Sequence, residues 1–218
     1  MRAPAPRADY GLDAPGFVRG CLLIGAVALA AGLVVATVAS AGGNTTDGLA
    51  VLSFAVARAA VWLGAVSVIS GLAMLWSSRY GKPRARDRLL DTLGLGGDET
   101  VLDIGCGRGL LLIGAAKRLP RGKAIGVDVW SGRDQSANTP EATLTNARVE
   151  GVADRVSVLT GDMRALPLVD ASVDCVVSSL AIHNLHGRDD RRRAIKELVR
   201  VLRPGGRIAL LDIANTAE

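Results

Sequence analysis

The sequence predicts a doubly wound α/β domain with a mainly parallel sheet, preceded by a hairpin of two transmembrane helices. Three observations lead to this prediction. Residues 20–78 are almost all apolar or small, whereas most charged residues lie outside that stretch. Behind it, short apolar runs alternate with helical patterns, which is typical of parallel sheets. A glycine-rich turn follows the first of these runs, at the position where such sheets bind ligands.

The first predicted span covers about residues 20–41 and the second about residues 59–78. Neither contains a charged residue, and about 20 apolar residues suffice to cross a bilayer core. Trp62 and Trp76 stand near the two ends of the second span, as aromatic residues do at membrane interfaces. Residues 42–47 are predicted to form the turn. The chain therefore divides into a cytosolic tail (1–19), the hairpin (20–78), a basic linker (79–88) and the α/β domain (89–218).

Basic residues predict the orientation of the hairpin. Arg2, Arg7 and Arg19 precede the first span, and Arg79, Lys82, Arg84, Arg86 and Arg88 follow the second. The turn between the spans carries none, so the positive-inside rule places both ends of the hairpin in the cytosol. The cluster behind the second span should also attract anionic lipid, which makes the bilayer a predicted partner. Arg58 either snorkels to the outer interface or shifts the start of the second span.

Two other interpretations of the apolar stretch remain open. Residues 39–41 resemble a signal-peptide cleavage site, so the first span could be removed. The two runs could also be a buried hairpin of a soluble protein, although no polar face interrupts them. The net charge of +5 does not predict nucleic-acid binding, because much of the excess lies in the juxtamembrane cluster and aromatic content is only 3%. Cys21, Cys106 and Cys175 are isolated from one another and are expected to be reduced cytosolic thiols.

The α/β domain is expected to begin with a short helix, because Leu89, Leu90 and Leu93 have helical spacing. Strands are predicted at residues 100–104, 123–129, 155–160, 173–178 and 207–213, with a helix at 109–119. Thr139 is suited to cap a further helix and Pro140 to begin it. The last helix is expected to carry Ile195, Leu198, Val199 and Leu202 on one apolar face, and residues 204–206 to end it.

The turn after the first strand reads Asp103-Ile104-Gly105-Cys106-Gly107-Arg108-Gly109. Glycines at these positions permit a tight turn and a close approach of backbone to a ligand, and the following helix offers unpaired N–H groups. Asp128 ends the second strand, where a carboxylate can accept hydrogen bonds from both hydroxyls of a ribose. These features indicate a nucleoside-type ligand.

Four ordered segments together resemble one family. VLDIGCGRG, GVDVW, the Gly161-Asp162-Met163 step and LRPGG are similar to the motifs of class I S-adenosylmethionine-dependent methyltransferases, with a Rossmann-like fold, over roughly residues 84–213. The segment ALPLVDASVDCVVSSLAIHNL most resembles the small-molecule branch related to quinone-biosynthesis methyltransferases. The resemblance implies S-adenosylmethionine as cofactor and a small or lipophilic methyl acceptor.

The resemblance also implies roles for individual residues. Asp103 would contact the methionine part of the cofactor, and Gly105, Cys106, Gly107 and Gly109 would wrap it. Asp128, with Val129 beside it, would hold the ribose. Asp162 would accept from the adenine amino group with Met163 nearby, unless it only caps the next turn. Ser178, at the end of the fourth strand, completes the predicted cofactor-binding set. Cys106 is expected to be a small packing residue and not a nucleophile.

His183 is the candidate catalytic base if the acceptor must lose a proton, although a loop histidine with only local partners is an equal alternative. His183 and His186 are the only histidines, and two without a third ligand predict no metal site. The loop at residues 130–138 is either a substrate lid or an ordinary solvated loop.

Two other functions stay open at this stage. A membrane-tethered module could bind S-adenosylmethionine without turnover. A nicotinamide-dependent oxidoreductase is less favoured, because Gly-x-Gly-x-x-Gly would be expected there. Members of the resembled family usually complete the sheet with an antiparallel strand pair after the fifth strand. Because the sequence ends at Glu218, we expect a fragment in which the fifth strand is an apolar edge.

Overall fold

The computed structural model describes residues 7–12, 15–41, 48–132 and 137–212. The chain forms two compact units. One is the helical hairpin, which extends from Leu12 to Gly81. The other is the α/β domain, which contains residues 7–11 and the chain from Lys82 onward.

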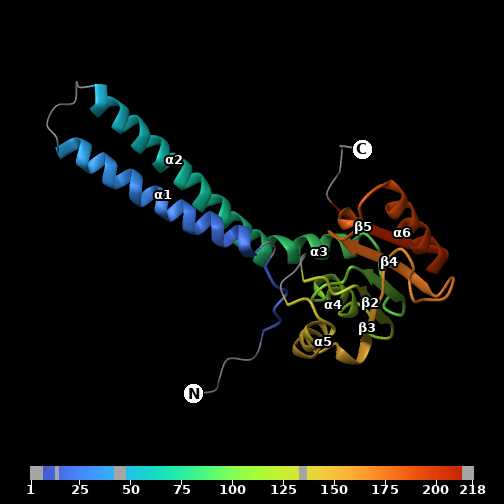
Figure 1. Cartoon of the computed structure of the whole chain (residues 1–218). Helices are drawn as coiled ribbons and strands as arrows, with labels where there is room; N and C mark the ends of the chain where they lie inside the picture. The colour runs from blue at the N-terminus through green and yellow to red at the C-terminus, as the bar shows by residue number, and fades with distance from the viewer. Residues whose placement is uncertain (1–6, 13–14, 42–47, 133–136, 213–218) are drawn as a thin grey trace, which may run out of the picture. The chain divides into compact units, whose positions relative to one another are not determined.

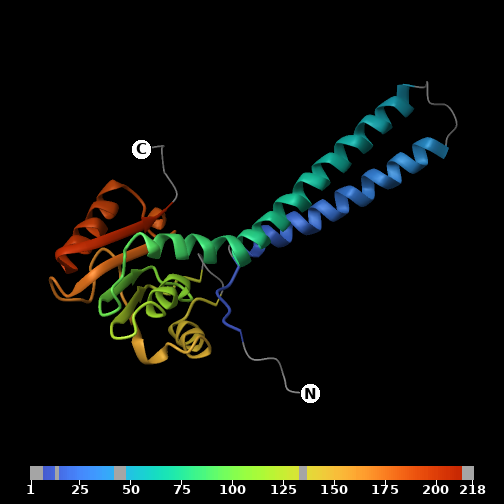
Figure 2. The same cartoon turned by 180° about the vertical axis from the view of Figure 1, so that it is seen from behind.

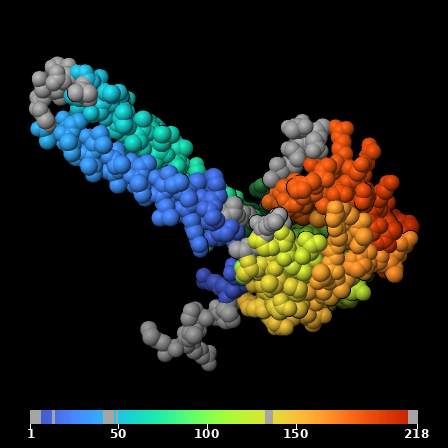
Figure 3. All heavy atoms as spheres, viewed as in Figure 1, coloured from blue at the N-terminus to red at the C-terminus, as the bar shows by residue number. Residues whose placement is uncertain are grey.

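The hairpin consists of α1 (Pro15–Ala41) and α2 (Gly48–Trp76), which run side by side (Figures 1 and 2). Small residues bring the two backbones into contact. A Cβ atom on Gly25 would lie 2.9 Å from the carbonyl oxygen of Gly64, and one on Gly32 would lie 2.9 Å from that of Ala57. The space-filling view shows the two helices in contact along the hairpin (Figure 3). Such close packing at small residues is common between membrane helices.

Large apolar side chains cover the outer surface of the hairpin. Leu23, Ile24 and Val27 of α1 are each more than two thirds exposed, as are Trp62 and Leu63 of α2. Both helices are long and apolar enough to cross a membrane. The second helix begins at Gly48, well before the predicted span at residue 59, so that Arg58 lies inside it. The predicted turn at residues 42–47 lies outside the described residues.

The predicted basic linker is helical. A π-helical turn (Ser77–Gly81) follows α2, and α3 (Lys82–Asp91) follows the turn. Leu90 of α3 and Leu93 behind it are buried in the core of the α/β domain. The helix was predicted to begin near Leu89, but α3 begins at Lys82. Residues 82–88 therefore belong to the folded domain and not to a linker.

The α/β domain is built on a five-stranded sheet in the order β3-β2-β1-β4-β5, with every neighbouring pair parallel. The strands are β1 (Thr100–Ile104), β2 (Lys123–Asp128), β3 (Val156–Thr160), β4 (Val173–Ser179) and β5 (Leu202–Leu211). The central strand β1 is buried along its whole length. All five strands were predicted from the sequence, with ends that differ by a few residues.

Helices cover both faces of the sheet, as predicted for a doubly wound fold. On one face, α3, α4 (Leu110–Ala116) and α5 (Pro140–Val149) pack with Val101 of β1 in one core cluster. On the other face, α6 (Arg188–Val201) packs Leu198 against a cluster that contains Leu102. Successive residues of a strand point to opposite faces, which explains why Val101 and Leu102 join different clusters. Thr139 caps α5, since its side chain accepts a hydrogen bond from Ala142 N at 3.2 Å.

Two details of the last helix and strand differ from the prediction. Helix α6 buries Ala194, Leu198 and Val201, whereas Ile195 and Val199 are 41% and 59% exposed. The predicted helix stop at residues 204–206 instead lies inside β5. The strand begins at Leu202 directly after the helix, and its register against β4 shifts between Val173 and Cys175. A glycine-containing irregularity of this kind adds residues to one strand without ending it.

Candidate functional site

The carboxyl ends of the central strands form the candidate site. The chain starts the sheet at β1, adds β2 and β3 on one side, and then crosses to add β4 and β5 on the other. Ligands of doubly wound sheets bind where the strand order reverses in this way. The glycine turn after β1, Asp128 at the end of β2 and His183 after β4 all lie at this edge.

The glycine turn has the backbone geometry that its sequence predicts. Gly105, Gly107 and Gly109 have φ angles of 68°, 51° and 85°, in the left-handed region where other residues are strained. A Cβ atom on Gly105 would also collide with the Cβ of Ala181, which follows β4. The turn is therefore a bare backbone surface that closely approaches the segment behind β4.

Side chains of α5 hold the glycine turn from behind. The hydroxyl of Thr143 donates to the carbonyl oxygen of Gly107 at 2.6 Å, and Asn146 Nδ2 donates to that of Arg108 at 2.9 Å. Both side chains are buried. Neither Thr143 nor Asn146 was predicted from the sequence to belong to the site. Their signal was the spacing of two polar residues, three apart, on the side of α5 that faces the core.

Asp103 is a buried carboxylate beneath the turn. It is 1% exposed, and its Oδ2 has no hydrogen-bond partner among the described residues. Burial raises the pKa of Asp103 to about 8; a backbone hydrogen bond from Leu112 opposes this rise and the charge of Asp128 adds to it. A buried acceptor without a donor costs free energy. This carboxylate therefore suits a cationic ligand group such as an ammonium.

Asp128 organises the loops around it. Its Oδ2 accepts from Gly107 N at 2.8 Å, and its Oδ1 accepts from Trp130 N at 2.7 Å and from Asn138 Nδ2 at 3.3 Å. A carboxylate has about four acceptor positions, so one remains for a ribose hydroxyl. A second ribose hydrogen bond would have to replace the long contact from Asn138. The predicted ribose role stays a prediction, as does that of the neighbouring Val129, which is 58% exposed.

Asp162 closes a turn in this structure. Its Oδ1 accepts from Arg164 N at 2.8 Å, and its Oδ2 pairs with Arg164 Nη2 at 2.6 Å. These hydrogen bonds from Arg164 hold the pKa of Asp162 below its ordinary value. The geometry matches the turn-capping alternative, and an adenine contact stays a prediction. Met163 lies near the glycine turn, since its Cε is 4.0 Å from where a Cβ of Gly105 would stand.

Cys106 and Ser178 are buried within the sheet and turn. Cys106 is 6% exposed, and burial raises the pKa of its thiol well above the ordinary value. The thiol is therefore neutral, as expected of a packing residue. The Ser178 hydroxyl donates to the carbonyl oxygen of Ile104 at 2.8 Å and ties β4 to β1. Its predicted contact with a cofactor stays a prediction. The hydroxyl already has this partner inside the sheet.

His183 has a carboxylate partner, Asp212, that was not predicted from the sequence. It lies in the 3-10 turn η3 (Ile182–Asn184), and its Nδ1 is 2.6 Å from Asp212 Oδ1. Asp212 directly follows β5 and reaches across from the neighbouring strand end. One feature of the sequence could have indicated this partner. Asp212 lies near the carboxyl end of the predicted fifth strand, as Asp103 and Asp128 lie near the carboxyl ends of the first and second strands.

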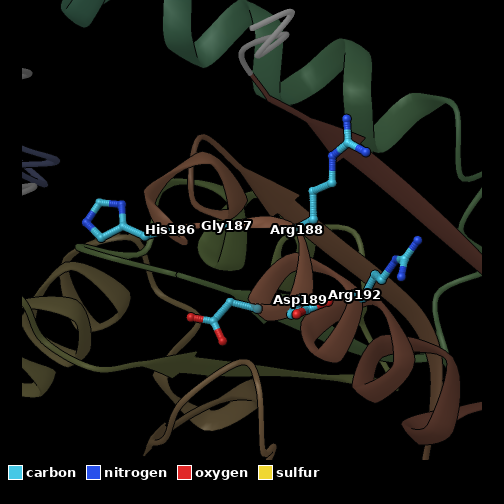
Figure 4. Close-up of a pocket in the computed structure, with 6 residues that line it drawn as sticks. His186, Gly187, Arg188, Asp189 and Arg192 are labelled. Carbon is cyan, nitrogen blue, oxygen red and sulfur yellow. The ribbon is translucent and has the colours of Figure 1, made fainter. Parts of the chain in front are cut away.

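A cavity of about 550 Å³ lies beside this edge, at the start of α6 (Figure 4). Its lining residues are His186, Gly187, Arg188, Asp189, Asp190 and Arg192. Asp190 pairs with Arg164 Nη1 at 2.8 Å, which links this cavity to the Asp162 turn. Among the described residues, no group of three His, Cys, Asp or Glu side chains could hold a metal ion. Residues 133–136 of the candidate lid lie outside the described residues.

The fold defines a doubly wound α/β protein with a glycine turn at the edge where such sheets bind nucleoside-containing ligands. A family model described as a methyltransferase domain matches residues 102–210. The chain belongs to this methyltransferase family, and S-adenosylmethionine is its cofactor. The residues of the candidate site fit it: Asp103 Oδ2, which has no hydrogen-bond partner among the described residues, suits the cofactor's ammonium group, and the glycine turn admits its close approach.

Individual relatives cover only the α/β domain. Methyltransferase GfsG of Streptomyces halstedii is 35% identical over 130 residues, which are 60% of this chain and 43% of that protein. The 27-O-demethylrifamycin SV methyltransferase of Amycolatopsis mediterranei is 38% identical over 129 residues, 59% of this chain and 44% of that protein. A solved structure of geranyl diphosphate methyltransferase in complex with GPP and sinefungin has a TM-score of 0.50 and 28% identity, and the match covers 59% of this chain and 44% of that chain. This chain thus spans less than half the length of these relatives.

Proposed function

We propose that the chain transfers a methyl group from S-adenosylmethionine to a small or lipophilic acceptor, with its α/β domain held on the cytosolic side of a membrane by α1 and α2. The observation that carries the chemical part is the buried Asp103 carboxylate beneath a glycine turn, at the point where the strand order reverses; its Oδ2 has no hydrogen-bond partner among the described residues. The observation that carries the anchor is the pair of long apolar helices with large exposed side chains.

When bound, S-adenosylmethionine supplies a methyl group made electrophilic by a sulfonium. The residues of the site bind the cofactor and orient it towards the acceptor. Asp103 pairs with the ammonium group, Asp128 accepts from the ribose, and the glycine turn allows backbone contact. Holding donor and acceptor in line can contribute roughly 7–11 kcal/mol to lowering the barrier. His183 takes a proton from an acceptor that must lose one.

The lengths of the helices support the anchor. Helices of 27 and 29 residues extend about 40 Å at 1.5 Å per residue, which exceeds a bilayer core of about 30 Å. If the hydrocarbon region begins near residue 59 of α2, Arg58 lies at the outer interface and the first part of α2 lies beyond it. This placement agrees with the arginines that follow α2, which favour a cytosolic α/β domain.

The proposed acceptor class has two supports. Two relatives carry names that refer to small molecules, 27-O-demethylrifamycin SV and geranyl diphosphate. The segment from Ala165 to Leu185 also resembles the quinone-biosynthesis branch of the family. A membrane anchor would confine the enzyme to the layer in which a lipophilic acceptor dissolves.

Incubation of membranes containing the full chain with radiolabelled methyl donor tests the proposed reaction. Wild-type membranes should transfer label to an extractable small molecule. Asp103→Asn removes the charge that pairs with the cofactor and should abolish transfer, whereas Asp98→Asn changes an exposed aspartate and should not. Equal transfer by the Asp103→Asn variant would contradict the proposed site.

Labelling with a membrane-impermeant maleimide tests the proposed topology. Asn44→Cys places a thiol between α1 and α2, and Lys123→Cys places one on an exposed position of the α/β domain. Both changes are combined with Cys21→Ser, because Cys21 is partly exposed and could react. Cys106 and Cys175 are buried and can stay. Asn44→Cys should react in intact cells and Lys123→Cys only after permeabilisation. The opposite order, or reaction of both from outside, would overturn the proposed orientation.

A further inference from the structure

One carboxylate fixes both the backbone and the ring of His183. Asp212 Oδ2 accepts from Ile182 N at 2.8 Å and from His183 N at 3.1 Å, while Oδ1 lies 2.6 Å from His183 Nδ1. The side chains of His183 and Asp212 are 27% and 21% exposed. The pair is therefore partly shielded but open to a substrate.

We infer that Asp212 is a positioning residue that presets His183 as the base for a hydroxyl acceptor, an inference that rests on the proposed methyl transfer. An ionised carboxylate only accepts hydrogen bonds. Nδ1 must therefore carry the hydrogen of this contact. In a neutral ring the other nitrogen, Nε2, is then unprotonated and able to take a proton.

The pair stands at the cofactor end of the sheet. Ala181, next to η3, is the residue that a Cβ on Gly105 would strike. Leu180 N donates to the carbonyl oxygen of Leu211 at 2.8 Å, which joins the segment before His183 to the strand end before Asp212. The contacts of β4 and β5 thus place Ala181, two residues before His183, beside the glycine turn and bring the His183–Asp212 pair to the same edge of the sheet.

A preset base indicates the kind of acceptor. A carboxylate or a neutral amine can attack a methyl group without first losing a proton, whereas an alcohol, phenol or enol is a weak nucleophile until it does. In the inferred step the hydroxyl proton moves to His183 Nε2, the oxygen forms the bond to the methyl carbon, and the electron pair of the broken carbon–sulfur bond stays on sulfur. The positive charge of the sulfonium is thereby replaced by that of the imidazolium.

A purely structural role for Asp212 makes a different prediction. Anchoring the backbone of η3 requires only Oδ2, so the protonation of the His183 ring would then be unconstrained. Nitrogen NMR of the imidazoles separates the two roles. The chain has only two histidines, so His186 serves as an internal control in every spectrum of the full chain in detergent.

In spectra recorded at a pH at which the ring is neutral, wild-type His183 should carry hydrogen on Nδ1 and none on Nε2. Asp212→Asn keeps an oxygen for the backbone contacts but offers an N–H to Nδ1, and should move the hydrogen to Nε2 without changing His186. Hydrogen on Nε2 in the wild type, or an unchanged ring in the variant, would overturn the inference. This measurement requires no acceptor. Calorimetry with S-adenosylhomocysteine runs beside it: a wild-type chain that binds none would refute the proposed methyl transfer itself, whatever the ring shows.

Label transfer in membranes tests the acceptor class. Asp212→Asn should reduce transfer about 100-fold or more, the usual contribution of general base catalysis, while S-adenosylhomocysteine binding stays unchanged. Asp170→Asn, at a carboxylate that is 78% exposed, is the matched control. The transferred label should resist mild alkali, as an ether does. Label released as methanol would identify a carboxylate acceptor and contradict the inference, as would an unchanged rate in the Asp212→Asn variant.

Discussion

The carboxylate of Asp128 accepts a hydrogen bond from the backbone N–H of Gly107 at 2.8 Å. This contact joins the end of β2 to the middle of the glycine turn, across the two strands that carry the cofactor site. The same side chain also holds Trp130 N at 2.7 Å. Asp128 thus holds the glycine turn and the loop after β2 in place, and it is also the candidate hydrogen-bond acceptor for the ribose.

Asp128→Ala should weaken the binding of S-adenosylhomocysteine by about 1.5–3 kcal/mol, because charge-assisted hydrogen bonds to ribose and to the turn lose their acceptor. Titration calorimetry measures the change. Asp154→Ala, at a carboxylate that is 74% exposed, should have no effect. An unchanged dissociation constant in the Asp128→Ala variant would refute the assigned role.

Cofactor binding should release a proton from Asp103. Its pKa in the empty site is about 8, so most molecules are protonated there at pH 7, and an ammonium beside the carboxylate favours the ionised form. We expect release of about one proton per ligand at pH 7 and much less at pH 9. Calorimetry in two buffers of different ionisation enthalpy gives the number. Asp98→Asn should release as many protons as the wild type, and zero release by the wild type at pH 7 would contradict a protonated Asp103.

The same pKa predicts how the empty domain responds to pH. The folded state holds the Asp103 proton more tightly than the unfolded chain, whose Asp pKa is near 3.8. The contribution of Asp103 to the free energy of unfolding is therefore greatest below pH 4 and declines as the pH rises towards 8. Thermal melts of Asp103→Asn at different pH values should lack this pH-dependent contribution to stability.

Thr143→Val should loosen the glycine turn. The substitution keeps the shape of a fully buried side chain but removes the donor to the carbonyl oxygen of Gly107, at a cost of about 1–3 kcal/mol in the free energy of unfolding. Thr143→Ser retains the hydroxyl and should lose less. Urea unfolding of the full chain in detergent compares the three proteins, and equal stability of wild type and Thr143→Val would mean that the contact does not hold the turn.

Gly64→Val should separate the two helices of the hairpin. A Cβ at Gly64 would lie 2.8 Å from the carbonyl oxygen of Gly25, whereas one at Gly20 would meet nothing within 4 Å. Overpacking of this kind costs roughly 1–3 kcal/mol. Titration with sodium dodecyl sulfate is followed by tryptophan fluorescence in proteins that also carry Trp130→Phe, so that only Trp62 and Trp76 contribute. It should show earlier unfolding of Gly64→Val and wild-type behaviour of Gly20→Val. Similar behaviour of both variants would contradict the glycine interface.

Patterns that depend on one element could be predicted from the sequence. The alternation of strands and helices gave the doubly wound sheet, and the glycines of the turn indicated its left-handed backbone. The apolar stripe of α6 was misassigned because Ile195 and Val199 lie at helical spacing from Leu198 but face solvent, while the smaller Ala194 is buried. Residues 204–206 were expected to end a helix because proline and glycine do so more often than they form an irregularity within a strand.

Contacts between distant elements could not be predicted in the same way. Asp212 meets His183 only because β5 pairs with β4, and Thr143 meets Gly107 only because α5 packs behind the turn. The partner of Asp162 was also missed, although Arg164 is two residues away. The charge of an arginine is visible in the sequence, but the direction in which its side chain points depends on the turn that Asp162 and Arg164 make together.

Binding of S-adenosylhomocysteine to the intact, folded chain in detergent tests the central claim most directly. Titration calorimetry should show one site per chain, with binding lost in Asp103→Asn and retained in Asp98→Asn. A chain that is folded by circular dichroism and gives no heat with S-adenosylhomocysteine or S-adenosylmethionine would contradict the account.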